Sequence, residues 1–145
     1  MPADTRAVCT ACGSINRLPE GKPAAEAKCG SCGQLLFSGH PADVTGDMFD
    51  RQIAKGTLPV VVDVWAPWCG PCRAMAPEYE KAAAATEPRV RFLKLNSDNE
   101  QAVAGRLGIR GIPTMLLYRD GKEIARVSGA RSARDITSWL DTALR

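Results

Sequence analysis

The sequence has few of the features that would place it in a membrane, in a secretory pathway or on nucleic acid. Its apolar runs, such as residues 60–62, are far too short to cross a bilayer. The opening residues, MPADTRAVC, contain no apolar segment of the signal-peptide type. Basic and acidic residues nearly balance, 19 against 16, without a long basic run. We therefore expect a cytoplasmic protein that binds neither membranes nor nucleic acid.

Two further absences narrow the chemistry. The chain has no GxGxxG fingerprint, so we expect no nicotinamide or other organic cofactor. It has one histidine, His40, beside a glycine and a proline. We expect His40 to be a solvated linker residue, with a fifth metal ligand or a pH-sensitive contact as alternatives.

Length and composition fit one ordinary domain plus a small appendage. The chain has 145 residues, of which 45% are hydrophobic. Residues 1–38 hold four of the six cysteines and few aliphatic side chains, and the composition changes near residues 39–44. We predict a small cysteine-rich unit (1–38), a linker (39–44) and a larger domain (45–145), in a chain that is a monomer.

The larger domain alternates strand-like and helix-like segments. Residues 58–66 are almost continuously apolar and β-branched, as in a strand buried on both faces. Asp120-Gly121 predicts a two-residue hairpin turn. Ser132 is a candidate N-cap for a helix whose apolar residues recur at helical spacing. The other expected segments are helices at 45–55, 73–85 and 98–107 (capped by Asp98 or Asn99 and ended by Gly108) and strands at 90–95, 113–119 and 122–128.

This element order predicts an α/β fold. Helix, strand, helix, strand, helix, strand, strand and helix follow one another along residues 45–145. Such an alternation gives a central mixed sheet with helices on both faces.

The pair Cys69 and Cys72 lies where a buried strand gives way to a helix. A two-residue gap places both sulfur atoms on one side of the first helical turn, close enough to form a disulfide. The unpaired N–H groups and the positive end of the helix dipole stabilise a thiolate at Cys69. Pro71 fits the first turn, where the N–H it lacks would have no partner. A lone CxxC can also be half of a zinc site, but the context WCGPC favours redox chemistry.

The spacing assigns different roles to the two cysteines. Cys69, at the exposed lip, should attack a substrate disulfide, and Cys72 should then attack Cys69 and release the reduced substrate. Trp68 offers an apolar face on which a partner can dock. Asp63 stands inside the apolar strand, where burial should raise its pKa and let it accept the Cys72 proton. The alternative is that Asp63 faces solvent at the strand end.

The four N-terminal cysteines have the spacing of a zinc site. Two CxxC pairs, each followed by glycine, are separated by 16 residues. Gly13 and Gly33 supply the positive φ that such a tight turn needs. Four thiolates fill a tetrahedral coordination sphere, so one structural Zn²⁺ is expected. Two further disulfides, or a redox switch in which oxidation ejects zinc, are the alternatives. The predicted ligands are Cys9, Cys12, Cys29 and Cys32.

The stretch WAPWCGPCR, residues 65–73, resembles the active-site stretch of the thioredoxin family, and the resemblance covers about residues 45–144. It implies that Asp63 is the family's buried carboxylate and Lys94 the lysine that faces it, although a strand lysine can equally be a solvated surface charge. It also implies a cis peptide bond at Ile112-Pro113, a glycine beside the substrate groove at Gly129 and a helix kink at Pro77. The implied substrate-binding residues are Trp68, Gly70, Pro71, Ile112, Pro113 and Gly129.

With its N-terminal extension, the chain is similar to the zinc-containing bacterial thioredoxins. The resemblance implies a protein-disulfide reductase that is reduced by a flavin-dependent thioredoxin reductase using NADPH. Two other functions remain open. A disulfide-forming oxidant is disfavoured because Gly-Pro between the cysteines resembles reductants. A zinc-ribbon binding or holdase module on a thioredoxin scaffold is disfavoured by the intact WCGPC.

Overall fold

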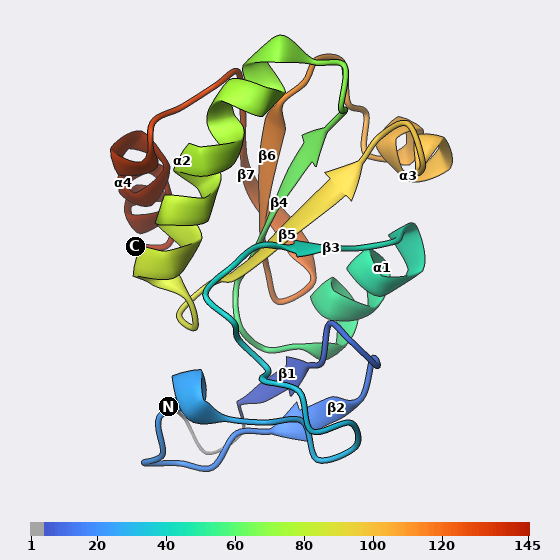
Figure 1. Cartoon of the computed structure of the whole chain (residues 1–145). Helices are drawn as coiled ribbons and strands as arrows, with labels where there is room; N and C mark the ends of the chain where they lie inside the picture. The colour runs from blue at the N-terminus through green and yellow to red at the C-terminus, as the bar shows by residue number, and fades with distance from the viewer. Residues whose placement is uncertain (1–4) are drawn as a thin grey trace.

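The computed structural model describes residues 5–145, which form a small N-terminal unit packed against one end of a larger domain (Figure 1). In the small unit, strands β1 (Arg6–Val8) and β2 (Ile15–Arg17) pair antiparallel. A short 3-10 helix, η1 (Ala24–Glu26), follows, and Lys28 and Leu35 form an isolated bridge. We call residues 5–38 the knuckle.

The larger domain is built on a five-stranded mixed sheet in the order β3-β5-β4-β6-β7. The central strand β4 pairs parallel with β5 and antiparallel with β6. At the edges, β3 runs parallel to β5 and β7 antiparallel to β6. The strands are β3 (Ala42–Asp43), β4 (Val60–Trp65), β5 (Arg91–Asn96), β6 (Thr114–Arg119) and β7 (Lys122–Ser128).

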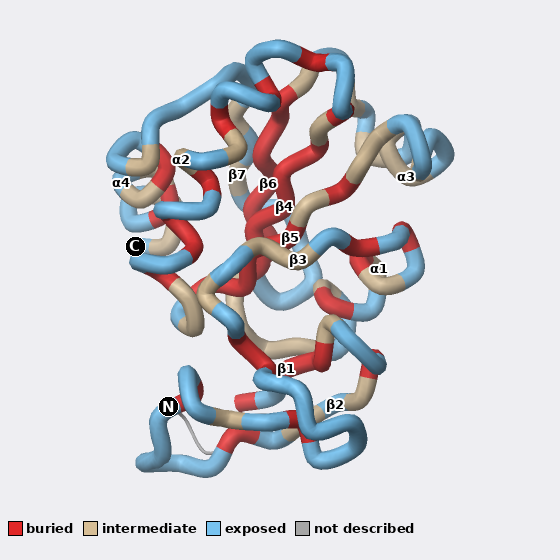
Figure 2. Tube along the Cα trace, in the orientation of Figure 1, coloured by how far each residue is buried: buried red, intermediate tan, exposed pale blue. Residues whose placement is uncertain are grey.

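Helices cover both faces of this sheet, as the sequence predicts. One face packs on α2 and α4, where Tyr79 and Ile136 lie in one buried cluster with Val61. The other face packs on α1, where Phe49 contacts Val62 and its neighbours. The central strands are buried along almost their whole length (Figure 2). The helices are α1 (Gly46–Lys55), α2 (Gly70–Thr86), α3 (Gln101–Arg106) and α4 (Ala133–Ala143).

Most predicted helix ends agree with the structure, and one is wrong. Ser132 caps α4 by accepting a hydrogen bond from the Asp135 N–H at 3.1 Å. The predicted cap of α3 at Asp98 or Asn99 is wrong, because the N-cap is Glu100 and no side chain caps this helix. The Asp98 carboxylate is instead bonded to the Trp68 indole. The interval 39–44, expected to be a linker, contains β3.

The knuckle and the CGPC loop lie at opposite ends of the larger domain (Figure 1). The knuckle contacts the end at which β4 and β5 begin, where Arg91 hydrogen-bonds to it. The CGPC loop follows the other end of β4, after Trp65. A six-residue strand spans about 17 Å, so the two cysteine-containing regions are well separated.

Candidate active site and metal centre

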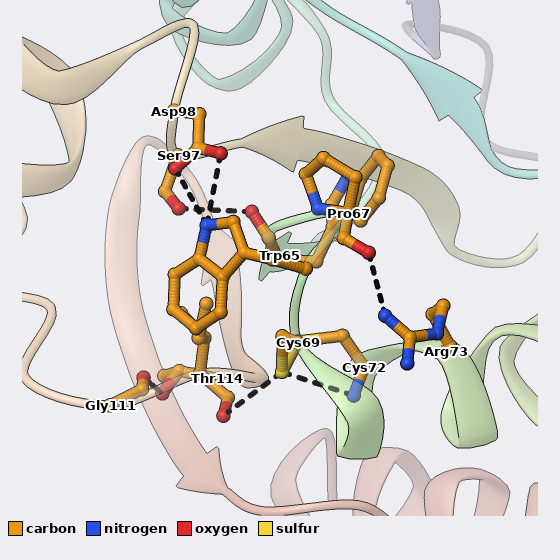
Figure 3. Close-up of a disulfide and its surroundings, with 11 residues drawn as sticks. Trp65, Pro67, Cys69, Cys72, Arg73, Ser97, Asp98, Gly111 and Thr114 are labelled. Carbon is orange, nitrogen blue, oxygen red and sulfur yellow. Dashed lines mark hydrogen bonds between the residues drawn. A yellow bond between two sulfur atoms is a disulfide. The ribbon is translucent and has the colours of Figure 1, made fainter.

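Cys69 and Cys72 form a disulfide at the start of α2, directly after the central strand (Figure 3). Their Cα atoms are 5.2 Å apart. Cys69 is the N-cap residue, and its sulfur accepts a hydrogen bond from the Cys72 N–H at 3.2 Å. The predicted redox pair is therefore joined in the structure, and the first-turn N–H group points at the Cys69 sulfur. This contact favours a thiolate on Cys69 once the disulfide is reduced.

The redox pair is less exposed than the sequence suggests. Cys69 is only 5% exposed and Cys72 only 2%. The neighbours Gly70 and Pro71 are exposed, and Trp68 is 67% exposed. A partner that approaches Cys69 therefore meets these three residues first.

The loop before β6 closes the other side of the redox pair. The Ile112–Pro113 peptide bond is cis, as the family resemblance implies. The Cys69 sulfur lies 3.7 Å from the carbonyl oxygen of Ile112. The N–H of Gly129 donates to the Pro113 carbonyl at 2.9 Å, so Gly129 lies beside this loop. The structure thus brings together Cys69, Ile112, Pro113 and Gly129.

Asp63 is buried within β4, not at its solvated end. It is 1% exposed, and its Oδ1 atom has no hydrogen-bond partner. Side chains alternate along a strand, so Asp63 shares the face of Val61, which is the face that packs on α2. Burial raises the pKa of Asp63 to about 7, against the opposing effect of Lys94. A carboxyl group with this pKa can take up or release a proton near neutral pH.

Lys94 acts on Asp63 through its charge and also contacts an aromatic ring. It pairs in register with Asp63 across β4 and β5, and its charge lowers the Asp63 pKa. Its Nζ atom also lies 4.4 Å from the centre of the Trp65 ring, a cation–π contact. The side chain is half-buried and so is neither a fully solvated charge nor a closed ion pair.

Sequence reasoning missed the partner of Trp68. The indole Nε1–H donates to both carboxylate oxygens of Asp98, at 3.1 and 3.0 Å. The Asp98 N–H in turn donates to the Asn96 side chain at 3.0 Å. These bonds hold the exposed indole ring over the active-site edge. No sequence pattern linked the two residues, because they are 30 positions apart.

The four N-terminal cysteines meet in one cluster, which we call the four-cysteine cluster: Cys9, Cys12, Cys29 and Cys32. All four sulfur atoms lie within 4.8 Å of one another. The sulfur atoms of Cys9 and Cys32 are 3.6 Å apart, as are those of Cys12 and Cys29, so each close pair joins the two CxxC units. A tetrahedral zinc site with Zn–S bonds of about 2.3 Å has sulfur atoms about 3.8 Å apart, so the cluster fits zinc. All four are free thiols, so the alternative of two more disulfides is wrong.

The two halves of the cluster repeat one backbone turn. The Gly13 N–H donates to the Cys9 carbonyl at 2.8 Å, and Gly33 bonds to Cys29 in the same way at 2.9 Å. Both glycines have φ of +79°, as predicted from their position after each pair. L-residues with a side chain rarely adopt this conformation. The turns therefore aim two sulfur atoms per unit at one point.

Asn16 joins the two turns, and sequence reasoning missed it. Its Oδ1 atom accepts from the Gly30 N–H at 2.9 Å, and its Nδ2 donates to the Cys29 sulfur at 3.5 Å. The Ser31 N–H also lies 3.4 Å from this sulfur. These bonds, that of Asn16 above all, lower the pKa of Cys29 to about 6.

His40 lies outside the four-cysteine cluster, so it is not a fifth ligand. Its Nδ1 atom is 2.8 Å from the Glu80 carboxylate on α2, and both side chains are largely exposed. The sequence predicted a solvated linker residue, which agrees with this exposure.

Comparison with known proteins identifies the larger domain. The family model described as Thioredoxin matches residues 40–142, which is more than half of the chain. The chain belongs to the thioredoxin family. A second family model, described as Thioredoxin 2, N-terminal, matches residues 8–34 and so covers all four cysteines of the cluster. The chain therefore combines the thioredoxin fold with the zinc-ribbon region of thioredoxin 2, and it is a thiol–disulfide oxidoreductase.

Individual relatives support this assignment. Thioredoxin C-3 of Corynebacterium nephridii is 38% identical over 95% of this chain and 94% of its own length, which includes the cysteine-rich region. The thioredoxin of Pseudomonas aeruginosa is 38% identical over 72% of this chain and 97% of its own. Among solved structures, a variant thioredoxin of Halobacterium salinarum superposes with a TM-score of 0.67 at 27% identity, covering 75% of this chain and 95% of that one.

Within residues 5–145, no helix combines the length and the apolar character needed to cross a bilayer.

Proposed function

We propose that this thioredoxin reduces disulfides in protein substrates through Cys69 and Cys72. The observation that carries the proposal is the position of the Cys69 sulfur. It caps α2, accepts the Cys72 N–H at 3.2 Å and lies 3.7 Å from the Ile112 carbonyl of the cis-proline loop. The same sulfur therefore meets a group that stabilises its negative charge and a loop on which an extended substrate can pair.

The first step is an attack by the Cys69 thiolate on one sulfur of a substrate disulfide. A bond forms between Cys69 and that sulfur while the substrate S–S bond breaks. The other substrate sulfur leaves as a thiolate and takes a proton from solvent. Trp68, Gly70 and Pro71 form the exposed surface that the substrate contacts during this step.

In the second step, Cys72 attacks Cys69. The Cys72 thiol loses its proton to Asp63, whose raised pKa suits a base near neutral pH. The Cys72 sulfur then bonds to the Cys69 sulfur while the bond between Cys69 and the substrate breaks. The second substrate sulfur leaves as a thiolate and takes a proton from solvent, and Asp63 releases its proton to solvent. The substrate has gained two electrons, and the protein has returned to the Cys69–Cys72 disulfide. Lys94 tunes the proton transfer because its charge lowers the Asp63 pKa.

The electrons come from a flavin-dependent thioredoxin reductase that uses NADPH, as the resemblance implies. In this proposal the chain serves electron transport in the cytoplasm and acts as a monomer. The arrangement of all six cysteines in three CxxC units is typical of metal or redox chemistry in a reducing compartment.

The four-cysteine cluster would hold one Zn²⁺ with a structural role. When bound, the metal cross-links the two CxxC turns of a knuckle that has a small core of its own. Four thiolate ligands leave no open coordination position for a substrate. The knuckle is also remote from Cys69, so its metal takes no part in the exchange steps. Its role in this proposal is to stabilise the chain. The alternative role is redox sensing by loss of zinc.

An insulin reduction assay driven by dithiothreitol or a reductase, with zinc quantified on the same sample, tests both the reductase activity and the zinc site. Activity with about one zinc per chain supports the proposal. Absence of activity with zinc bound contradicts the reductase, and native protein that carries no zinc, whatever its activity, contradicts the metal site. Cys72→Ser should accumulate a mixed disulfide with substrate, visible by mass spectrometry under non-reducing conditions. If none accumulates, Cys72 is not the resolving residue.

One observation favours a second function, a binding module. The knuckle exposes two large apolar side chains, Ile15 at 47% and Leu35 at 48%. Changing both to serine should abolish suppression of aggregation of an unfolded test protein if the knuckle grips such chains. Unchanged suppression, or none in the native protein, removes this candidate.

A further inference from the structure

Arg91 is a buried charge at the boundary between the knuckle and the thioredoxin domain. It is the first residue of β5 and is 4% exposed. Its guanidinium donates to the Leu36 carbonyl at 2.6 Å and to the Val8 carbonyl at 3.0 Å. It also lies 4.1 Å from the centre of the Phe37 ring. All three partners belong to the knuckle, so one side chain of the thioredoxin domain holds both ends of the metal-binding segment.

The two carbonyls that accept hydrogen bonds from Arg91 lie close in sequence to the metal ligands. Val8 directly precedes Cys9, and its carbonyl also accepts from the Gln52 side chain of α1 at 3.0 Å. Leu36 follows Cys32 by four residues, and its N–H is bonded to the Ala27 carbonyl. The positions of both carbonyls therefore depend on how the chain around the four-cysteine cluster is fixed.

Glu87 supplies the compensating charge on the thioredoxin side. It is the C-cap residue of α2 and is half-buried. One carboxylate oxygen accepts from the Gly39 N–H at 3.2 Å, and the other accepts from the Phe92 N–H at 3.0 Å. Burial lowers the pKa of Arg91 and raises that of Glu87, and the attraction between the two opposes both shifts. The cavity beside Arg91 measures only about 10 Å³, so at most one water molecule could replace a lost partner.

We propose that Arg91 couples metal occupancy of the four-cysteine cluster to the stability of the thioredoxin domain. The inference rests on the proposed zinc site. Without metal, the chain around Cys9 and Cys32 loses its cross-link. The carbonyls of Val8 and Leu36 then leave the guanidinium, which remains buried without acceptors and destabilises β5.

The coupling must act in both directions. If zinc stabilises the contacts of Arg91, then Arg91 strengthens zinc binding by the same factor, although it touches no ligand. Metal occupancy thus changes the stability of the thioredoxin domain through two backbone carbonyls. Loss of zinc weakens the domain at the end remote from Cys69.

The test compares Arg91→Met with Arg89→Met. Met keeps the apolar stem and removes the buried charge, whereas Arg89 is exposed, with its nearest carboxylate at 3.9 Å. All three tryptophans lie between residues 65 and 139, so their fluorescence reports unfolding of the thioredoxin domain alone. Unfolding is followed with zinc bound and after chelation under reducing conditions, and zinc affinity is measured by competition with a colorimetric chelator.

We expect chelation to lower the Tm of the native protein by about 5 °C or more, and by less than half as much in Arg91→Met. Zinc should bind Arg91→Met about tenfold more weakly, as expected for lost bonds to a charged group, and Arg89→Met unchanged. Should Arg91→Met fail to fold, Gln52→Leu, which removes the other donor to Val8, must show the same direction of change.

Equal zinc-dependent shifts and equal affinities in Arg91→Met and Arg89→Met would overturn the coupling while leaving the zinc site intact. The coupling would also be overturned if removal of zinc did not change the Tm of the native protein. A native protein that binds no zinc overturns the proposed metal site, and the coupling with it, so the two failures are distinguishable by stoichiometry.

Discussion

The redox pair and each half of the four-cysteine cluster have the same CxxC spacing but different chemistry. In the redox pair, the chain continues as helix, and the Cys72 N–H points at the Cys69 sulfur. In the knuckle, the chain instead turns back at a glycine with φ of +79°. The N–H of the residue after the second cysteine bonds to the first cysteine's carbonyl in all three units, so this bond does not distinguish them. The helical start of α2 brings the two sulfurs of one unit into a disulfide. The glycine turns of the knuckle instead direct the sulfurs of both units toward one shared metal position.

The comparison teaches that the residue after the second cysteine is as informative as the spacing. Arg73 continues α2, whereas Gly13 and Gly33 reverse the chain. A helix N-terminus stabilises a single nucleophilic thiolate. A reversing turn instead needs a second, identical turn and a cation to neutralise four thiolates.

The largest expected effect separates the two kinds of cysteine. Cys69→Ser should lower insulin reduction by about 10³-fold or more, because no thiolate remains to attack. Cys12→Ser removes a cluster ligand and should abolish tight zinc binding, yet keep the reduction rate within about threefold, because the cluster takes no part in the exchange steps. If Cys12→Ser also abolishes reduction at a temperature where the protein is folded, the two regions are not chemically independent.

Next in size is Asp63→Asn. Turnover should slow by about 10²-fold, the usual contribution of a general base, and lose its dependence on a group titrating near pH 7. The stability of the folded protein should rise in this variant at high pH, whereas its turnover falls. The folded pKa is raised from 3.8 to about 7, so the native protein loses stability as pH rises through this window, and the variant does not.

At pH 8.5 the oxidised variant should therefore be more stable than the native protein, by up to about 4 kcal/mol, and nearly equal to it at pH 4. Urea unfolding at the two pH values measures this. Asp141→Asn, an exposed carboxyl on α4, is the control and should change neither quantity. Equal pH dependence in Asp63→Asn and the native protein would contradict the assigned role.

A smaller effect is expected for the knuckle turn itself. In Gly33→Ala the added methyl group meets nothing within 4 Å, so the cost is the left-handed backbone alone, about 1–2 kcal/mol. Zinc affinity should fall roughly tenfold, as such a cost implies. Gly30→Ala is the matched control, because its methyl group would meet only the Asn16 side chain, at 3.8 Å. Similar affinities in both variants would show that the turn conformation does not set metal binding.

The smallest effect concerns the exposed edge of the redox site. Trp68→Phe loses the two bonds to Asp98 but keeps an aromatic face. Stability should change by less than about 0.5 kcal/mol, as for other exposed positions. The KM for a protein substrate should rise about two- to threefold with kcat unchanged, since only docking is affected. A fall in kcat with KM unchanged would place Trp68 in the chemical steps.

The sequence predicted the redox half of the molecule well because its signals are local. A β-branched strand, Pro71 in a first helical turn and Ser132 before an apolar stripe each act on their immediate neighbours. The charge of Asp63 within that strand was visible as an anomaly, and the structure shows it buried. The functional roles of these residues remain predictions.

What the sequence did not reveal depends on contacts between distant segments. Arg91 looks like an ordinary strand residue until Val8 and Leu36 are brought to it from the N-terminal region. Asn16 follows no pattern, because its partners lie on the second turn of the knuckle. The local context of Asp98 predicts a helix cap, but its carboxylate is bonded to the Trp68 indole. The one available signal was a basic residue opening a buried strand at Arg91.

The boundary between knuckle and domain has a consequence for how the chain can diverge. The thioredoxin side contributes side chains such as those of Arg91, Gln52 and Glu87, and each hydrogen bond that they make across this boundary ends on a main-chain atom of the knuckle or of Gly39. Every residue carries a carbonyl and, except proline, an N–H group. The knuckle's surface sequence is therefore free to drift over evolutionary time, provided that the cysteines, the turn glycines and the buried Phe37 persist.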